Sequence, residues 1–363
     1  MAYVFNTDLL LNEPDEEAAR KEFPNIFFAL NNPELRSAFK PFDERANSAK
    51  TRSRKWGVIA VLLATGALML AGGEMLFHGL PKGQIRTLAA LGGVAGIASV
   101  LIGVFGIMFR ERKMRWLADR LATERIRQFH FQSFVFGATD ILKGARDDAA
   151  AEAFVKKRSE DFSKFEADLL SNVDGKLKEM VHHDHDEEGL IFADEPLSAP
   201  DADPHLDEYL RAYVLLRFNR QISYCDLILR EGDGFWKHAP SQQAKILGGV
   251  ALACVFGILF LHGLVFFGAI ANIAWMKGPL VHVFAIWAAI VALSARTFEE
   301  GFQPEREIER MRQYRLALRR IYARFQKAAT TDAKLAAMID LEKLSYEEMV
   351  LFLKGNYEAE FIM

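Results

Sequence analysis

The sequence has little cysteine, no excess of charge of one sign and none of the familiar catalytic motifs. Only two of its 363 residues are cysteines, and Cys254 lies within an apolar run, so a disulfide-stapled scaffold is excluded. The 45 basic and 48 acidic residues leave a net charge of −3, which gives no electrostatic reason to expect a nucleic-acid partner. The sequence contains no phosphate-binding loop, dinucleotide-binding glycine motif, nucleophile elbow or HExxH zinc motif. We therefore expect a protein that is not an enzyme and that uses no cofactor.

Alternating strand patterns are also missing, so the predicted fold class is all-α. What the sequence does contain is four long apolar blocks, at residues 56–77, 87–109, 246–270 and 276–295. About 20 apolar residues are enough for a helix to cross ~30 Å of hydrocarbon. A soluble helix of that length would keep a polar face, and these blocks have almost none. The blocks therefore predict four membrane spans.

The connections within each pair of blocks are short. Residues 78–86 join the first two blocks, and residues 271–276 join the last two. Neighbouring helices joined by short loops run antiparallel. We therefore predict an all-α membrane protein with two antiparallel transmembrane helical hairpins and cytoplasmic helical regions.

Basic residues gather at the outer ends of both predicted hairpins. They are Lys50, Arg52, Arg54, Lys55, Arg110, Arg112, Lys113, Arg115, Lys245 and Arg296. The side of the membrane with more lysine and arginine is normally the cytoplasm, so both termini and the middle region are predicted to be cytoplasmic. The first 30 residues are acidic and do not resemble a cleavable signal peptide.

These features predict five regions along the chain. They are a cytoplasmic helical lead-in (1–55), a first hairpin (56–109), a cytoplasmic helical middle region (110–245) with an acidic loop (182–204), a second hairpin (246–295) and C-terminal cytoplasmic helices (296–363). Each half has a lead-in, a hairpin and a charged exit helix in the same order. An internal duplication is our hypothesis, and independent acquisition of two hairpins is the alternative.

Small residues recur on one face of two of the spans. The second span carries Gly92, Gly96, Ser99, Gly103 and Gly106, and the third carries Gly249, Ala253 and Gly257. In lipid, small residues let helix backbones approach closely. We expect these faces to pack helices together within one subunit, and the functional alternative is an oligomer interface or a pore lining.

Three ionisable residues lie inside the predicted spans, namely Glu74, His262 and His282. Ionisable groups are costly in a bilayer and frequently mark a function. Glu74 is three residues from the end of its span, so it can also reach the membrane interface. Either histidine can form a hydrogen bond to a neighbouring helix, which is the favoured interpretation of both.

The densest group of metal-ligand side chains is in the acidic loop. The run His182, His183, Asp184, His185 and Asp186 lies there. Imidazole and carboxylate groups together suit zinc, but the spacing matches no closed structural motif. A solvated acidic loop is the favoured interpretation, and a metal-dependent membrane enzyme is an alternative.

Two short patterns beside the hairpins resemble a known family. The residues that carry them are Trp116, Arg120, Glu124 and Arg127 after the first hairpin, and Arg217, Gln221 and Tyr224 before the second. The C-terminal run LEKLSYEEMVLFLKGNYEAEF is similar in style. Over residues 35–136 and 209–363 the chain resembles the bacterial SLATT family of proteins with two transmembrane helices, and it differs in holding two hairpins in tandem.

The resemblance implies hairpins in the bacterial inner membrane with cytoplasmic helical extensions. It also implies an oligomeric, pore-forming effector of conflict systems, which often acts beside nucleotide-sensing components. No sensing domain is evident here, so we expect the trigger to be a cytoplasmic protein or a small molecule. The expected partners are the lipid bilayer and further copies of the chain. The alternative function is a non-conducting membrane scaffold that recruits a cytoplasmic partner.

Overall fold

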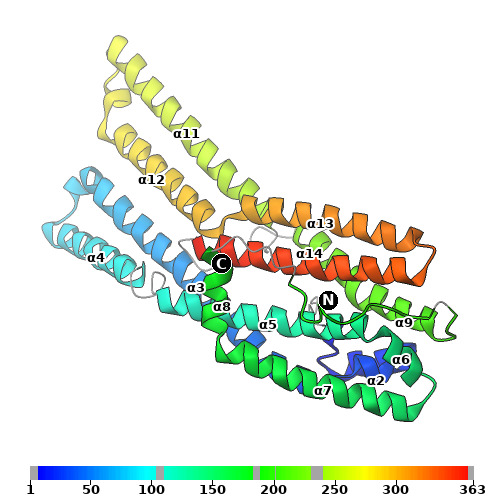
Figure 1. Ribbon diagram of the computed structural model, residues 1–363. Helices are drawn as coiled ribbons and strands as arrows, with labels where there is room; N and C mark the ends of the chain where they lie inside the picture. The colour runs from blue at the N-terminus through cyan, green and yellow to red at the C-terminus, as the bar shows by residue number, and fades with distance from the viewer. Residues whose placement is uncertain (1–6, 104–109, 183–188, 201, 230–239, 359–363) are drawn as a thin grey trace. The chain divides into compact units, whose positions relative to one another are not determined.

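A computed structural model describes residues 7–103, 110–182, 189–200, 202–229 and 240–358. It is 87% helix, with no strand in those ranges, so the all-α prediction is confirmed. The chain divides into two compact units (Figure 1). The helical unit comprises residues 1–48, 114–229 and 309–358, and the membrane unit comprises residues 49–113, 230–308 and 359–363.

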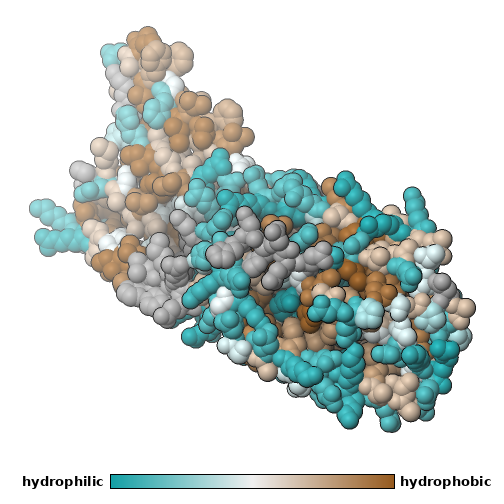
Figure 2. Space-filling model, in the orientation of Figure 1, coloured by the Kyte–Doolittle hydropathy of each residue, from teal (hydrophilic) through white to brown (hydrophobic). Residues whose placement is uncertain are grey.

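The membrane unit contains four helices that are long and apolar enough to cross a membrane. They are α3 (Pro33–Gly72), whose second half belongs to this unit, α4 (Lys82–Leu101), α11 (Pro240–Ile270) and α12 (Pro279–Phe302). Large apolar side chains such as Val94, Ile97 and Phe260 point outward, and each is more than 60% exposed. Figure 2 shows mainly hydrophobic residues on the visible surface of α11 and α12, with a few polar ones among them. Hydrocarbon is the solvent that suits such a surface, which is consistent with a multi-pass membrane protein.

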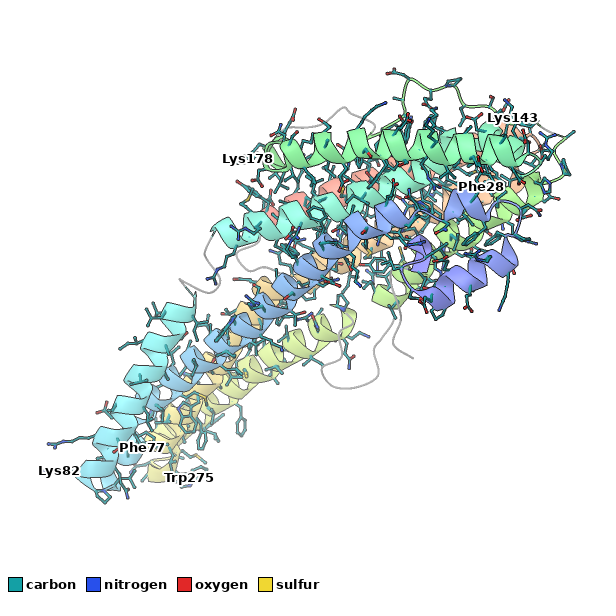
Figure 3. The ribbon with its side chains drawn as sticks, turned by 90° about the horizontal axis from the view of Figure 1, so that it is seen from below. Phe28, Phe77, Lys82, Lys143, Lys178 and Trp275 are labelled. Carbon is teal, nitrogen blue, oxygen red and sulfur yellow. The ribbon has the colours of Figure 1, made fainter. Side chains whose placement is uncertain are left out.

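Short 3-10 turns join these helices in sequence. The turn η2 (Glu74–Gly79) lies between α3 and α4, and η5 (Ala274–Lys277) lies between α11 and α12. Figure 3 labels Phe77 within the first turn, Lys82 at the start of α4 and Trp275 within the second turn, all at one end of the membrane unit. Two residues after the end of α11, Asn272 has a left-handed backbone φ of 55°, a conformation that asparagine tolerates better than most residues.

Helix α12 ends at a sharp break in the backbone. Gln303 follows it with φ 41° and ψ 44°, and its N–H donates to the carbonyl oxygen of Glu299 at 2.8 Å. Pro304 then begins α13 (Pro304–Lys327), where its missing N–H and fixed φ cost nothing. The break therefore separates the apolar helix from the arginine-rich one.

The helical unit is built from short and medium helices. They are η1 (Thr7–Leu9), α1 (Glu13–Glu22), α2 (Phe27–Leu30), the first part of α3, α5 (Arg110–Phe136), α6 (Ala138–Gly144), α7 (Asp148–Ser171), α8 (Val173–His182), α9 (Leu206–Tyr213), the π-helical segment η4 (Val214–Phe218), α10 (Asn219–Leu229), most of α13 and α14 (Thr331–Glu358). The predicted lead-in 1–55 is thus divided, because its last residues belong to the membrane unit.

Several helix starts in this unit follow from polar caps in the sequence. Asn12 accepts a hydrogen bond from the Asp15 N–H at 3.0 Å, and Asn32 accepts one from the Leu35 N–H at 3.1 Å. Asp147 does the same for Ala149 at the start of α7. Each cap satisfies a backbone donor that the first turn of a helix leaves without a partner.

Aromatic side chains dominate the core of the helical unit. Phe134 stacks on Tyr209 with ring centroids 4.6 Å apart, and Phe129 packs against both Phe162 and Phe165. These pairs join α5 to α7 and α9. Offset and edge-to-face ring pairs add about 0.5–1.5 kcal/mol each beyond the burial of their surface. The core therefore fixes α5 between helices that are distant from it in sequence.

The break at Gln303 generates a stability prediction. A left-handed conformation costs a residue with a Cβ about 1 kcal/mol, and glycine avoids this cost. We expect Gln303→Gly to leave the thermal stability in detergent unchanged or slightly higher. Gln303→Val, which adds a branch at Cβ, should lower the stability. Equal melting temperatures for the two variants would contradict the importance of this backbone conformation.

Candidate functional site: a buried ion-pair core

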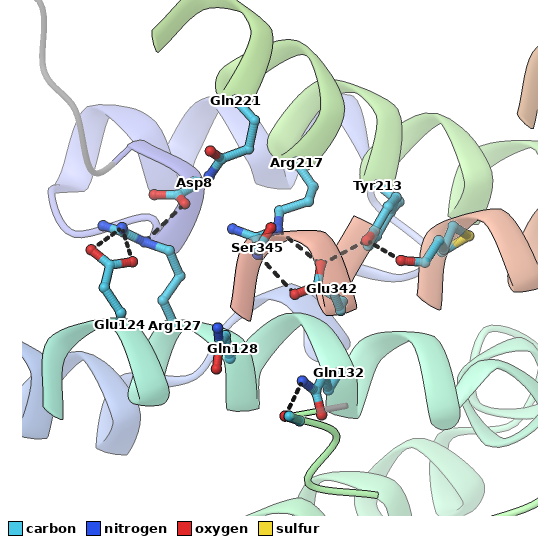
Figure 4. Close-up of polar contacts among 12 residues, drawn as sticks. Asp8, Glu124, Arg127, Gln128, Gln132, Tyr213, Arg217, Gln221, Glu342 and Ser345 are labelled. Atoms are coloured by element: carbon cyan, nitrogen blue, oxygen red, sulfur yellow. Dashed lines mark hydrogen bonds and ion pairs between the residues drawn. The ribbon is translucent and has the colours of Figure 1, made fainter. Parts of the chain in front are cut away.

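A fully buried ion pair lies at the centre of the helical unit. The side chains of Arg217 and Glu342 are only 2% and 1% exposed. Arg217 donates from Nε and Nη2 to the two carboxylate oxygens of Glu342, at 2.9 and 2.8 Å (Figure 4). The hydroxyl of Tyr213 donates towards Glu342 Oε1 at 2.7 Å, with the carbonyl oxygen of Met338 at 3.1 Å as its other acceptor. Such paired hydrogen bonds are strong and fix the orientation of both groups.

The local backbone and an aromatic ring position Arg217. The residue lies in the π-helical segment η4, a rare conformation that is often found at functional positions. Its guanidinium lies 4.4 Å from the ring centroid of Phe131 on α5. Burial by itself would lower the pKa of Arg217, but the carboxylate of Glu342 outweighs burial and raises it. The pair therefore stays charged inside the core.

A second ionic group joins the N-terminal turn to α5. Arg127 contacts Glu124 at 2.9 Å and Asp8 at 3.2 Å, and Arg120 contacts the same Glu124 at 2.7 Å. Burial raises the pKa of Asp8 despite the opposing effect of Arg127. Burial also acts to raise the pKa of Glu124, but Arg127 and Arg120 overcome it and the pKa is lowered. Asp8 is therefore the member of this group that gains a proton most easily.

The residues of the two family-like patterns all lie in the helical unit. Arg120, Glu124 and Arg127 form the second ionic group, and Arg217 forms the buried pair. Trp116 is buried and meets the ring of Phe352 edge-on, with centroids 6.0 Å apart. Gln221 accepts a hydrogen bond from the hydroxyl of Tyr314 at 3.2 Å, and Tyr224 packs against the edge of the core. The structure thus gives these residues packing and ion-pair roles.

Three members of the ionic core were not identified from the sequence, namely Asp8, Tyr213 and Glu342. Glu342 had a detectable signal, because it shares the buried face of α14 with Met338 and Met349. A carboxylate on an otherwise apolar helix face requires a partner. Asp8 had no such signal, because a single turn shows no periodicity.

His130 is a buried neutral histidine on α5. Burial, reinforced by Arg158, Arg217 and Arg36, lowers its pKa to about 3. Arg158 is held in place by the carbonyl oxygens of Ala29 and Asn31, to which it donates at 2.6 and 2.8 Å. The imidazole is therefore uncharged at neutral pH and cannot act there as a cation.

Polar contacts also join α3 to α12 within the membrane unit. The hydroxyl oxygens of Thr65 and Ser294 are 2.6 Å apart, and Trp287 donates from Nε1 to the carbonyl oxygen of Met69 at 2.9 Å. In lipid, such interhelical hydrogen bonds contribute about 0.6 kcal/mol on average and up to about 1.7. They connect helices from the two ends of the sequence.

The small residues of α4 and α11 differ in their surroundings. A Cβ on Gly92 or Gly96 would lie 3.5 or 3.7 Å from Leu70 or Ala67 of α3, and Ser99 donates to the carbonyl oxygen of Ala60 at 2.8 Å. Two residues beyond the end of α4, a Cβ on Gly103 would meet nothing within 4 Å, and Gly106 lies outside the described residues.

On α11, a Cβ at Gly249 or Gly257 would likewise meet no atom within 4 Å, and Ala253 is exposed. The α4 series therefore packs on α3 through three of its members. The α11 series faces away from the other described helices.

The three ionisable residues of the spans are not brought together. Glu74 is exposed at the start of the η2 turn, and His282 is exposed on α12. His262 is exposed on α11, and its Nδ1 lies 2.9 Å from the carbonyl oxygen of Ile258 in the same helix. The described polar contact of His262 is therefore within its own helix and not with a neighbouring helix.

The histidine cluster falls mostly outside the described ranges. His183 and His185 lie among residues that the structure does not describe. The Nε2 atom of His182 is 3.1 Å from the hydroxyl oxygen of Tyr357. Within the described ranges, no group of three or more histidine, cysteine or acidic side chains is arranged to hold a metal ion.

Comparisons with family models, curated proteins and solved structures give no match to this chain. The resemblance to the SLATT family therefore stays a prediction from the sequence patterns. What the described residues define is a helical protein with four apolar helices that can cross a membrane and with a buried ionic core in its other unit.

The buried pair generates a stability prediction. Glu342→Ala leaves the guanidinium of Arg217 buried without its partner, and we expect a loss of about 3–5 kcal/mol of unfolding free energy. The double change Arg217→Met with Glu342→Leu should recover most of this loss, because no buried charge remains. Thermal unfolding in detergent measures both. Lys164→Ala, which breaks a pair whose lysine is 77% exposed, is the control and should cost under about 1 kcal/mol.

His130 generates a pH prediction. The unfolded chain binds a proton here below about pH 6.5, whereas the folded chain does so only near pH 3. The contribution of His130 to the free energy of unfolding is therefore larger at higher pH. It decreases by about 1.4 kcal/mol per pH unit as the pH drops below about 6.5. Between pH 6.5 and 5, wild type should lose about 2 kcal/mol more than His130→Gln. His205→Gln, which removes a histidine from outside the buried core, is the control for the loss of one imidazole. Parallel curves for wild type and His130→Gln would contradict the buried neutral state.

Proposed function

We propose that the protein is an oligomeric, multi-pass inner-membrane protein whose helical unit controls the permeability of the membrane. The observation that carries the proposal is the open small-residue face of α11, formed by Gly249, Ala253 and Gly257. On an apolar helix, such a face allows close approach of another helix. Because no described helix of the same chain occupies it, a second copy is the occupant that we propose.

Two antiparallel hairpins are the membrane arrangement we propose, with both termini and the middle region in the cytoplasm. The short turns η2 and η5 support the hairpins. The basic residues at the opposite ends of the spans support the orientation. The resemblance to the SLATT family supports a bacterial inner membrane and a pore-forming activity.

Control by the helical unit is supported by two features of that unit. Helix α3 contributes residues to both units, so the two units share one helical segment of the chain. The buried pair of Arg217 and Glu342 makes alternative packings costly unless the pair is formed again. We therefore expect the helices of this unit to pack in a few distinct ways and not to shift gradually against one another. The proposed trigger is a cytoplasmic protein or small molecule that favours one of them.

A non-conducting scaffold is the second candidate function. It uses the same spans and the same open face of α11, and it differs only in leaving the bilayer sealed. No observation on the described residues favours a metal-dependent enzyme, and the Nε2 atom of His182 is 3.1 Å from the hydroxyl oxygen of Tyr357.

The test combines the mass of the protein in lipid nanodiscs with dye release from liposomes. Gly249→Leu and Gly257→Leu place bulk on the open face, so each should reduce the oligomer population and the dye release by about tenfold, which corresponds to ~1.4 kcal/mol per interface. Gly93→Leu is the matched control, because a Cβ there also meets no atom within 4 Å but lies on α4. It should behave as wild type.

Three outcomes separate the candidate functions. Oligomers that release dye support the pore. Oligomers that keep the dye inside, with and without cytoplasmic extract, support the scaffold. A strictly monomeric protein in lipid, whatever is added, overturns both the oligomer and the pore.

A further inference from the structure

One cationic side chain of the membrane unit is partly buried beside a small recess. Arg54 on α3 is half-buried, and its guanidinium lies 4.9 Å from the ring centroid of Phe302 at the end of α12. The recess lies between the two helices and is lined by Ser53, Arg54, Gly57 and Val61 from α3, and by Thr297, Phe298, Gly301 and Phe302 from α12. Most of this lining is apolar or small, so the recess offers one cation and an otherwise hydrocarbon-like surface.

Arg54 has no acidic partner in the part of the chain that the structure describes. Its described contact is the ring of Phe302. Arg296, near the same end of α12, is different, because its Nη1 pairs with Glu299 at 2.5 Å. Removing a guanidinium from water without an anion is unfavourable. An anion from outside the chain would therefore be bound more strongly at Arg54 than at an exposed or already paired arginine.

The position of the recess along the spans specifies which anion fits. Arg54 stands two residues before the apolar block that begins at Trp56, and Thr297 follows the block that ends at Ala295. Both sides of the recess thus lie where a span meets the headgroup region, with apolar helix on one side and charged helix on the other. A phospholipid presents its phosphate at this depth, with acyl chains directed towards the apolar side. A free phosphate offers nothing to the apolar lining.

We propose that the recess between α3 and α12 binds an anionic phospholipid. Its phosphate pairs with Arg54, and the first part of an acyl chain lies along Gly57, Val61 and Phe298. The lipid would then contact two helices that come from opposite ends of the sequence, next to the hydrogen bond between Thr65 and Ser294 on the same two helices. The proposal rests on the membrane placement in the proposed function and is independent of oligomers and conduction.

Native mass spectrometry of the full chain in non-ionic detergent tests the proposal. The protein is titrated with phosphatidylglycerol and, separately, with phosphatidylcholine carrying the same acyl chains. Wild type should retain phosphatidylglycerol with the higher affinity. Arg54→Gln should lose about tenfold in that affinity, because one charge-assisted contact is removed. Arg52→Gln removes the same charge from an exposed position on the same helix and should keep the preference.

A further variant and a competition experiment distinguish a loss of charge from altered packing, and a lipid from a free anion. Arg54→Lys keeps the charge and should keep most of the preference, so a loss seen only in Arg54→Gln comes from the missing charge and not from altered packing. Equal binding of the two lipids by wild type overturns the proposal, and so does an unchanged preference in Arg54→Gln. Displacement of phosphatidylglycerol by equimolar inorganic phosphate would assign the site to a free anion and overturn the lipid. Loss of oligomers or of dye release leaves these lipid counts unaffected.

Discussion

The packing of the helical unit depends on the buried ion pair between Arg217 and Glu342. Arg217 and Glu342 are 125 positions apart, and each is surrounded by apolar side chains from several helices. If either side chain moved, the other would be left as an unpaired charge in the low-dielectric interior. An unpaired buried charge costs far more free energy than a missing methyl group. A buried pair adds little net stability compared with a hydrophobic pair, but any packing that shifts the two helices would have to break it, which is strongly unfavourable. The aromatic residues around it supply the cohesion.

The membrane unit is held together by different forces. Where lipid surrounds the helices, burying an apolar side chain gains little, because the hydrocarbon outside is as apolar as the protein. Close backbone approach and hydrogen bonds then decide which helices associate. Helix α4 packs on α3 through Gly96 and Ser99, and α12 is joined to α3 by Thr65 and Trp287. Helix α3 is thus the common partner of α4 and α12, whereas α11 packs on α12.

The all-α class and the four apolar helices could be predicted from the sequence because hydrophobic length is a local property. The residues of the ionic core could be predicted only in part. Arg127 and Glu124 are three positions apart on one helix, so their pairing follows from helical spacing. The partner of Arg217 could not be predicted, because 125 positions separate it from Glu342 and no local rule links them. In the same way, helical spacing placed Gly249 and Gly257 on one face of their span. It could not show that α12 lies against a different face of that helix.

The π-helical segment at Val214–Phe218 has a consequence for how this chain can change over generations. A π-helical turn holds one residue more than an α-helical turn. The wider turn accommodates this extra residue locally, so the helices on either side keep the faces that they would have in a regular helix. Deleting a single codon there would restore a regular α-helix and leave α9 and α10 on their present faces, whereas a deletion within α9 or α10 would rotate one end of that helix by about 100° relative to the other. Along this stretch of chain, the π-helical segment is therefore the place where a one-residue deletion would disturb the packing of both flanking helices least.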